Sequence, residues 1–171
     1  MITKPLATQY APYYETYIKL VNEDDLIPAL KRVAKIWNDL LAGLSEEQLN
    51  YRYAEGKWSV KEVLIHMTDA ERVFAYRALR FARNDKTALS GFDENTWVPE
   101  SNATDRSLDS LIKEHNNVRG ASISLFESFS DEVSMRTGSA NGKEISVRAL
   151  GYITVGHELH HLKVIQERYL K

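Results

Sequence analysis

Four segments of the chain carry apolar residues at the spacing of an amphipathic helix, and no other feature of the sequence restricts the fold as strongly. They span about residues 24–44, 59–83, 108–129 and 146–169. In each segment the apolar side chains recur every three or four residues and so share one helical face. In the first they are Leu26, Leu30, Val33, Trp37, Leu40 and Leu44, and the second face consists of Val63, His66, Ala70, Val73 and Arg77. Few stretches of the chain show the alternation of apolar and polar residues that is typical of a β-strand. The sequence therefore predicts an all-α protein, a four-helix bundle.

The connections between the segments predict the topology. Residues 84–106 separate the second and third helices and contain Gly91 and Pro99. A connection of that length inside a compact domain is usually functional or crosses the bundle from end to end. We therefore expect helices two and three to be parallel, in an up-down-down-up bundle with one long crossover. Residues 45–49 are expected to form a short helical turn, and residues 138–142 a flexible turn.

Composition excludes several classes of protein. The chain has 171 residues, which fits one domain over residues 1–171. A formal net charge of −2, with basic residues scattered among acidic ones, argues against a nucleic-acid partner. Since there is no cysteine, a metal site must use His, Asp or Glu. Neither a signal peptide nor a membrane-spanning run is found, so we expect a cytoplasmic protein with no membrane partner.

The histidines suggest a metal site. His157 and His161 are four residues apart on the apolar face of the fourth segment, so both can reach one metal ion. His160 lies between them and is turned away from that face. His66 lies on the apolar face of the second segment, at a matching height if the two helices are antiparallel. We predict that His66, His157 and His161 bind one divalent metal ion.

The third segment carries two more polar residues at or beside its apolar face. His115 lies midway along the helix with Asn116 and Asn117 beside it, which favours a hydrogen-bonded or bundle-edge histidine over a ligand. Arg119 could hold an anionic group of a substrate, but a surface ion pair is the simpler expectation.

Residues 157–161, HELHH, also match the H-E-x-x-H pattern, in which two histidines bind zinc and the glutamate activates water. The extended form of this pattern requires glycine and histidine where this chain has Val164 and Glu167. Another form requires an acidic ligand on a later helix, but only ten residues of the sequence follow His161. We therefore do not expect a protease. Glu158 is still a candidate for contacting a metal ligand or transferring a proton.

Several motifs resemble those of the DinB-like superfamily. Residues 58–66, WSVKEVLIH, resemble its W-S-x-x-E-x-x-x-H motif, which supplies the first metal ligand. Residues 156–161, GHELHH, followed by ERYL at 167–170, resemble its last-helix signature. The stretches GFDENTW at 91–97 and SVRAL at 146–150 are similar to one branch of the superfamily.

This resemblance covers nearly the whole chain and implies a metal-binding four-helix bundle of up-down-down-up topology. The three ligands of the superfamily fall on His66, His157 and His161. The resemblance also implies nickel, zinc or another divalent ion. In several members the activity implied is a metal-dependent transfer of a low-molecular-weight thiol to an electrophile.

Three imidazoles leave coordination positions open, which is the arrangement of a catalytic site. A metal ion there lowers the pKa of a bound water or thiol and so produces a nucleophile at neutral pH. Our first hypothesis is a transferase that joins a low-molecular-weight thiol to an electrophile. A hydrolase that uses metal-bound water is its close alternative. A non-catalytic bundle, stabilised by its metal and binding a partner or ligand, is the rival.

The long connection offers a wall for the pocket of a small-molecule substrate. Phe92 and Trp97 would supply its apolar surface and Asp93 a polar group. The alternative is a crossover that only packs against the side of the bundle.

The N-terminal tyrosines suggest a second surface. Tyr10, Tyr13, Tyr14 and Tyr17 combine apolar rings with polar tips, a composition favoured at interfaces, and the resemblance implies a homodimer. The alternative is that these rings cover one end of their own bundle.

Overall fold

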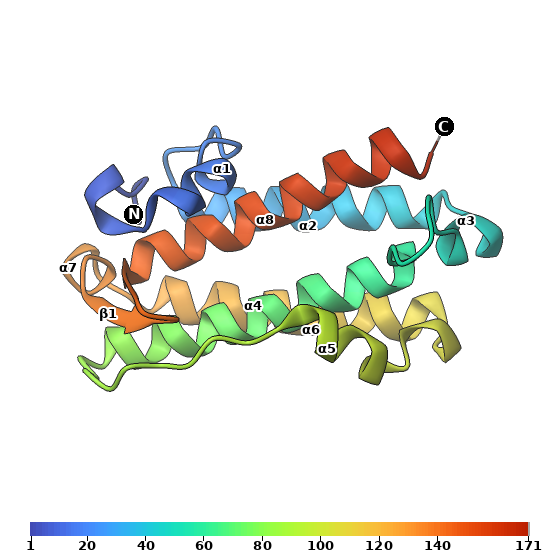
Figure 1. Ribbon diagram of the computed structural model, residues 1–171. Helices are drawn as coiled ribbons and strands as arrows, with labels where there is room; N and C mark the ends of the chain where they lie inside the picture. The colour runs from blue at the N-terminus through green and yellow to red at the C-terminus, as the bar shows by residue number, and fades with distance from the viewer. Residues whose placement is uncertain (171) are drawn as a thin grey trace.

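The computed structural model describes residues 1–170 and contains four long helices (Figure 1). They are α2 (Leu26–Ala42), α4 (Val60–Ala82), α6 (Leu108–Glu127) and α8 (Val147–Arg168). Their ends differ from the predicted ones by at most two residues. The prediction of an all-α four-helix bundle is confirmed.

Serine side chains cap three of these helices at their first turn. At the start of α4 the Ser59 hydroxyl accepts a hydrogen bond from the Glu62 N–H at 3.3 Å, and the Glu62 carboxylate accepts one from the Ser59 N–H at 2.7 Å. Ser107 and Ser146 cap α6 and α8 in the same position. Each cap satisfies backbone donors that have no partner within the helix, which explains why the helices begin where they do.

The topology is up-down-down-up, as predicted. α4 packs against α8 and α6, and α2 packs against the same two helices from the opposite corner of the bundle. Figure 1 shows the chain running back along the bundle after α4, so that α6 starts at the same end as α4. α4 and α6 are therefore parallel, whereas α4 and α8 are antiparallel.

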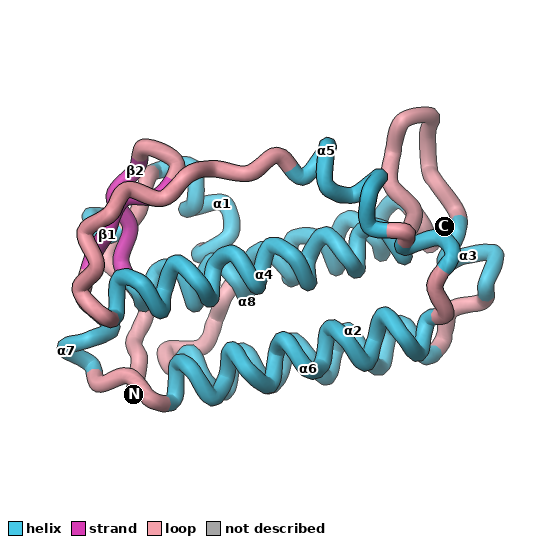
Figure 2. Tube along the Cα trace, turned by 90° about the horizontal axis from the view of Figure 1, so that it is seen from below, coloured by secondary structure: helices cyan, strands magenta, loops and turns pink. Residues whose placement is uncertain are grey.

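The crossover is more structured than a loop. It contains the short helix α5 (Glu94–Trp97) and the 3-10 turns η3 (Val98–Ser101) and η4 (Ala103–Asp105). Two further short helices lie at the ends of the bundle (Figure 2): α3 (Glu46–Asn50), which is the predicted turn, and α7 (Asp131–Ser134).

A small hairpin replaces the flexible turn expected at residues 138–142. Strands β1 (Thr137–Ala140) and β2 (Lys143–Ser146) pair antiparallel, and Asn141 and Gly142 between them both have positive φ angles, of 51° and 70°. A two-residue turn with positive φ at both positions matches the twist of a hairpin. Leu89 of the crossover donates to the Ser139 carbonyl at 2.9 Å and accepts from the Asn141 N–H at 2.9 Å. Strands this short leave no alternating pattern in the sequence.

The N-terminal segment forms η1 (Ala7–Gln9), η2 (Pro12–Tyr14) and α1 (Glu15–Ile18), and α1 packs against α8. Tyr10 is buried, and Tyr14 and Tyr17 are partly buried against the core, whereas Tyr13 is 66% exposed. Three of the four tyrosines thus cover their own bundle, and the homodimer stays a prediction.

No helix in residues 1–170 is both long enough and apolar enough to cross a membrane.

We predict opposite effects for the same substitution at two helical glycines. A Cβ on Gly156 would lie 2.2 Å from the carbonyl oxygen of Tyr17, so Gly156→Ala must displace α1 and should destabilise the protein by about 1–3 kcal/mol. Gly120 has nothing within 4 Å of a built Cβ, so Gly120→Ala should stabilise α6 by about 0.5–1 kcal/mol. Urea denaturation of both variants checks this. A stable Gly156→Ala protein would contradict the close packing of α1 on α8.

Candidate metal centre

Three histidine side chains from two antiparallel helices meet at one point beneath α1. The Nε2 atom of His157 lies 3.1 Å from Nε2 of His66 and 3.0 Å from Nε2 of His161. His157 and His161 are one turn apart on α8, and His66 faces them from α4. These are the three predicted ligands, and the tertiary structure brings them together.

The arrangement fits a divalent metal ion. Two imidazole nitrogens bound to one tetrahedral zinc ion at 2.0–2.1 Å are about 3.3 Å apart, close to the separations in this cluster. All three ligand atoms lie within 4.8 Å of one another. In the part of the chain that the structure describes, no carboxylate completes this group, so a bound ion would retain open positions.

Burial keeps the three rings in the form that binds metal. It lowers the pKa of His66 to about 4 and that of His161 to about 3, where the neighbouring histidines add to the effect. The pKa of His157 is also well below its ordinary value, for the same reasons. All three are therefore neutral near pH 7, with a nitrogen lone pair available to a metal.

A cavity of about 400 Å³ opens at the three histidines. Its walls are largely aromatic, formed by Tyr13, Tyr14, Tyr17, Trp58, Phe74 and Phe92. The polar side chains on the remaining wall are Arg77, Glu94, Asn141 and His160. The volume falls within the range of small-molecule sites.

Comparison with known proteins identifies the family. The sequence profile of the DinB superfamily matches residues 29–165. The chain belongs to this superfamily. Among its relatives, a protein of Geobacillus thermodenitrificans is 27% identical over 71% of this chain and 68% of its own length. One of Geobacillus kaustophilus is 24% identical over 94% of this chain and 89% of its own length. Both are named as candidate metal-dependent hydrolases.

A solved structure shares the fold. YfiT from Bacillus subtilis matches with a TM-score of 0.68 over 97% of this chain and 91% of its own, at 18% sequence identity. It is described as a probable metal-dependent hydrolase with an unusual four-helix bundle topology. At this identity the likeness supports the fold alone.

The crossover borders the cavity, but not through all of the expected residues. Phe92 lines the cavity, and Trp97 packs behind it with ring centroids 4.9 Å apart and is 43% exposed. Asp93 instead caps α5, accepting a hydrogen bond from the Asn95 N–H at 3.0 Å. Its neighbour Glu94 is the carboxylate on the wall, a place that the sequence did not indicate.

His160 lies on the cavity wall but outside the three-histidine cluster. Its ring packs edge-on against Tyr17, with centroids 5.6 Å apart, and it is half-buried. The histidine is therefore placed to contact a bound molecule rather than to join the other three, in agreement with its helical position.

Glu158 faces away from the cavity, into the core. Its Oε1 atom lies 2.8 Å from Nη2 of Arg119 and 3.3 Å from Nε2 of His115, all three side chains being buried. Burial raises the pKa of Glu158, and the charge of Arg119 opposes this shift. In the H-E-x-x-H pattern the glutamate activates water at the metal, and this role has no geometric basis here. Proton transfer to a bound substrate has none either.

Arg119 corrects the expectation of a surface ion pair. It is 2% exposed, and its Nε and Nη2 atoms each donate to the Glu71 carboxylate at 2.9 Å. A charged residue beside an apolar face is expected at the surface, but here two carboxylates compensate the charge of Arg119 inside the core. With Glu71 and Glu158 bound to it, Arg119 is also not free to hold a substrate.

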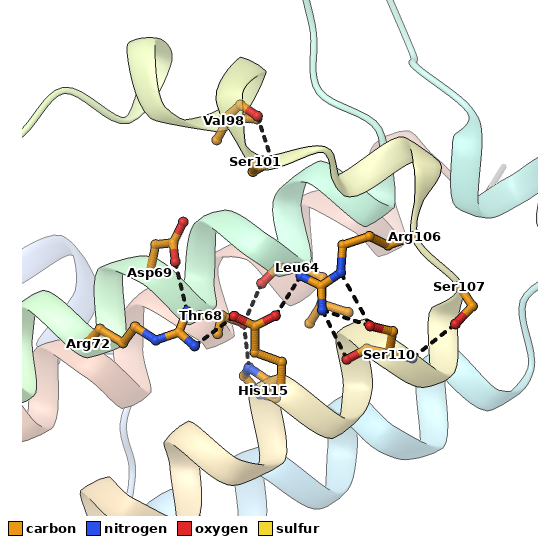
Figure 3. A network of polar contacts seen from close by, with 11 residues as sticks. Leu64, Thr68, Asp69, Arg72, Val98, Ser101, Arg106, Ser107, Ser110 and His115 are labelled. Carbon is orange, nitrogen blue, oxygen red and sulfur yellow. Dashed lines mark hydrogen bonds and ion pairs between the residues drawn. The ribbon is translucent and has the colours of Figure 1, made fainter.

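His115 is a buried, hydrogen-bonded residue, as its position favoured. Figure 3 shows its Nδ1 atom next to the Thr68 hydroxyl, 3.2 Å away, and that hydroxyl donates to the Leu64 carbonyl at 2.9 Å. Near it, Arg72 of α4 binds Glu114 of α6 and so joins the two helices, and Arg106, which precedes α6, binds the same carboxylate.

A larger open groove of about 1010 Å³ lies on the outside of this α4–α6 pair and includes Tyr76, Leu79 and Leu125. It contains none of the grouped metal-ligand side chains of the described chain. Size alone therefore does not locate the chemistry of this protein.

We predict that metal binding depends on the three clustered histidines only. His66→Ala, His157→Ala and His161→Ala should each lose most of the bound zinc, because two ligands remain. His160→Ala is the matched control, since this histidine lies on the same helix and the same cavity wall. Metal analysis of protein purified without chelator or affinity nickel measures the outcome. Loss of zinc from His160→Ala and not from His161→Ala would contradict the assigned ligands.

We also predict a pH dependence for the metal-free protein. Unfolded histidine titrates near pH 6.5, whereas folded His66 and His161 titrate near 4 and 3. Between these values the unfolded state binds protons that the folded state excludes. The free energy of unfolding should therefore fall as the pH decreases from 6.5 to 4, by about 1.4 kcal/mol per pH unit for each such proton.

Urea denaturation in EDTA at several pH values measures this slope. His66→Gln should show a smaller slope than the wild type, because one titrating ring is gone while all carboxylates are unchanged. Equal slopes for the two proteins would show that His66 is protonated in the folded state.

Proposed function

We propose that this protein is a metal-dependent hydrolase of a small organic molecule bound in the aromatic cavity. The observation that supports this most directly is the position of the three-histidine cluster. It lies at the wall of a ligand-sized cavity, and no fourth protein ligand of the described chain closes it. A structural zinc site is normally closed by four protein ligands, whereas a catalytic site keeps a position open.

The side chains of the cavity have separate roles in this proposal. His66, His157 and His161 hold the ion, which when bound acts as a Lewis acid and lowers the pKa of a coordinated ligand. The aromatic walls offer apolar surface to a bound molecule. Glu94 is the carboxylate on the wall and can accept a proton. Burial raises the pKa of Tyr14 and Tyr17, so their hydroxyls stay protonated and can donate hydrogen bonds.

The names of the relatives support hydrolysis in preference to other reactions at such a site. The proteins of Geobacillus thermodenitrificans and Geobacillus kaustophilus are both named for a metal-dependent hydrolase activity. A transferase that joins a low-molecular-weight thiol to an electrophile requires the same open metal position, with the thiol in place of water. The two reactions therefore differ in the nucleophile and not in the three ligands.

The test uses zinc-loaded and nickel-loaded protein with a panel of small p-nitrophenyl esters, with and without glutathione. Hydrolysis should require the metal. It should fall at least about a hundredfold in EDTA and in His157→Ala, since Lewis-acid catalysis supplies several kcal/mol. His160→Ala should retain the metal and is the control for changes in the cavity wall.

Each other outcome points to a different function. Turnover that appears only with added thiol, with formation of a thioether from an electrophile such as monobromobimane, would identify a transferase. Activity that is unchanged in EDTA would contradict a metal-dependent reaction. Tight zinc binding without turnover of any of these substrates would indicate a metal-stabilised bundle that does not catalyse.

A further inference from the structure

A second part of the same cavity contains a positive charge without a carboxylate partner. Arg77 of α4 is only 4% exposed, and it lies on the cavity wall. Among the described residues no carboxylate comes within ion-pair distance of its guanidinium, including Glu94 on the same wall. A buried charge is normally paired, because removing it from water is costly. Burial accordingly lowers the pKa of Arg77.

The guanidinium is held in place by groups that do not neutralise it. Its Nη2 atom donates to the Ser90 carbonyl at 2.8 Å, and its Cζ atom lies 5.8 Å from the centre of the Phe92 ring. Tyr14 lines the cavity close enough for the charge of Arg77 to oppose the rise in its pKa that burial causes. One N–H of five is used in this hydrogen bond, so an arginine fork is available to an anion.

Arg77 and His66 lie on the same face of α4. They are eleven residues apart, which is close to three full turns and about 16 Å along the helix axis between their Cα atoms. Both side chains line the one cavity, and Ala70 and Phe74 line it between them. The cavity thus connects the metal centre with the arginine along one helix.

We propose that Arg77 binds the carboxylate of an elongated substrate whose reacting group lies at His66, His157 and His161. This inference rests on the proposed function, because it assigns the far end of the substrate of that reaction. It specifies a substrate with an apolar middle part, which the rings of Tyr14, Phe74 and Phe92 contact, and one negative end.

The charges on the wall favour a carboxylate over a phosphate. Arg77 is the one lysine or arginine among the lining residues of the described chain, and Glu94 supplies a negative charge to the same cavity. One guanidinium can neutralise a monoanion, whereas a phosphate dianion would keep a net negative charge in a cavity that also contains Glu94. The planar fork of arginine also matches the two oxygens of a carboxylate.

A binding experiment tests this without requiring turnover. The probes are suberic monohydroxamic acid, whose hydroxamate binds zinc and whose other end is a carboxylate, and its neutral analogue with a terminal carboxamide. Calorimetry on zinc-loaded protein should show the acid binding about tenfold tighter than the carboxamide, as expected for one charge-assisted bidentate contact. Arg77→Gln should abolish this preference while leaving the zinc content unchanged.

Three further variants separate a binding role from a structural one. Arg80→Gln removes the same charge one turn away, outside the cavity, and should keep the preference. Arg77→Lys keeps the charge and loses the fork, so it should leave an intermediate preference of about threefold. Glu94→Gln should strengthen binding of the acid, because it removes a like charge. If Arg77 only anchors the crossover through Ser90, Arg77→Gln would weaken both probes equally.

Equal affinity of the two probes for the wild type, or failure of the acid to bind the zinc-loaded protein, would overturn the inference. So would a preference that persists in Arg77→Gln. The proposed hydrolysis fails separately: a protein that prefers the acid through Arg77 but turns over no ester retains the anion site and loses the hydrolase assignment. Ester hydrolysis without a preference for the acid would support the hydrolase assignment and overturn the anion site at Arg77.

Discussion

A single buried arginine contacts all four helices of this bundle, and the position of the metal centre depends on it. Arg119 extends from α6, donates to the Leu30 carbonyl of α2 at 2.9 Å and binds Glu71 of α4 and Glu158 of α8. Removing one member of a buried ion pair leaves an uncompensated charge in the core, which costs about 3–5 kcal/mol. Apolar contacts tolerate sliding and rotation, whereas these polar contacts require one register.

This ion cluster and the metal centre share two helices and lie on different faces of them. Glu158 directly follows His157 on α8, and Glu71 lies five residues after His66 on α4. When Arg119 holds the two carboxylates, the histidines of α4 and α8 are therefore held at matching heights. The cluster thus positions the ligands without touching a substrate, which explains why a glutamate within an H-E-x-x-H pattern faces the core.

Segments outside the four long helices form part of the wall of the cavity beside the metal centre. α1 covers α8 at Gly156, the crossover supplies Phe92 and Glu94, and the hairpin adds Asn141. Gly91 and Asn141 meet so closely that a Cβ on the glycine would lie 2.6 Å from the asparagine Oδ1 atom. The rigid bundle places the ligands, and these connecting segments shape the space in front of them, where substrate specificity is expected to differ among relatives.

The sequence by itself determined the four helices, the parallel pair α4 and α6 and the histidines that converge, because these follow from a period of 3.6 residues and from the length of one connection. It could not determine which residues of other helices or loops a side chain contacts. Arg77 and Arg119 both occur at or beside apolar helical faces. Arg119 nevertheless reaches two carboxylates, whereas Arg77 reaches a cavity. Likewise Glu94 and not Asp93 lines the pocket, because Asp93 caps α5. Only the tertiary structure decides such cases, since the energy of a buried charge depends on partners that are distant in the sequence and close in space.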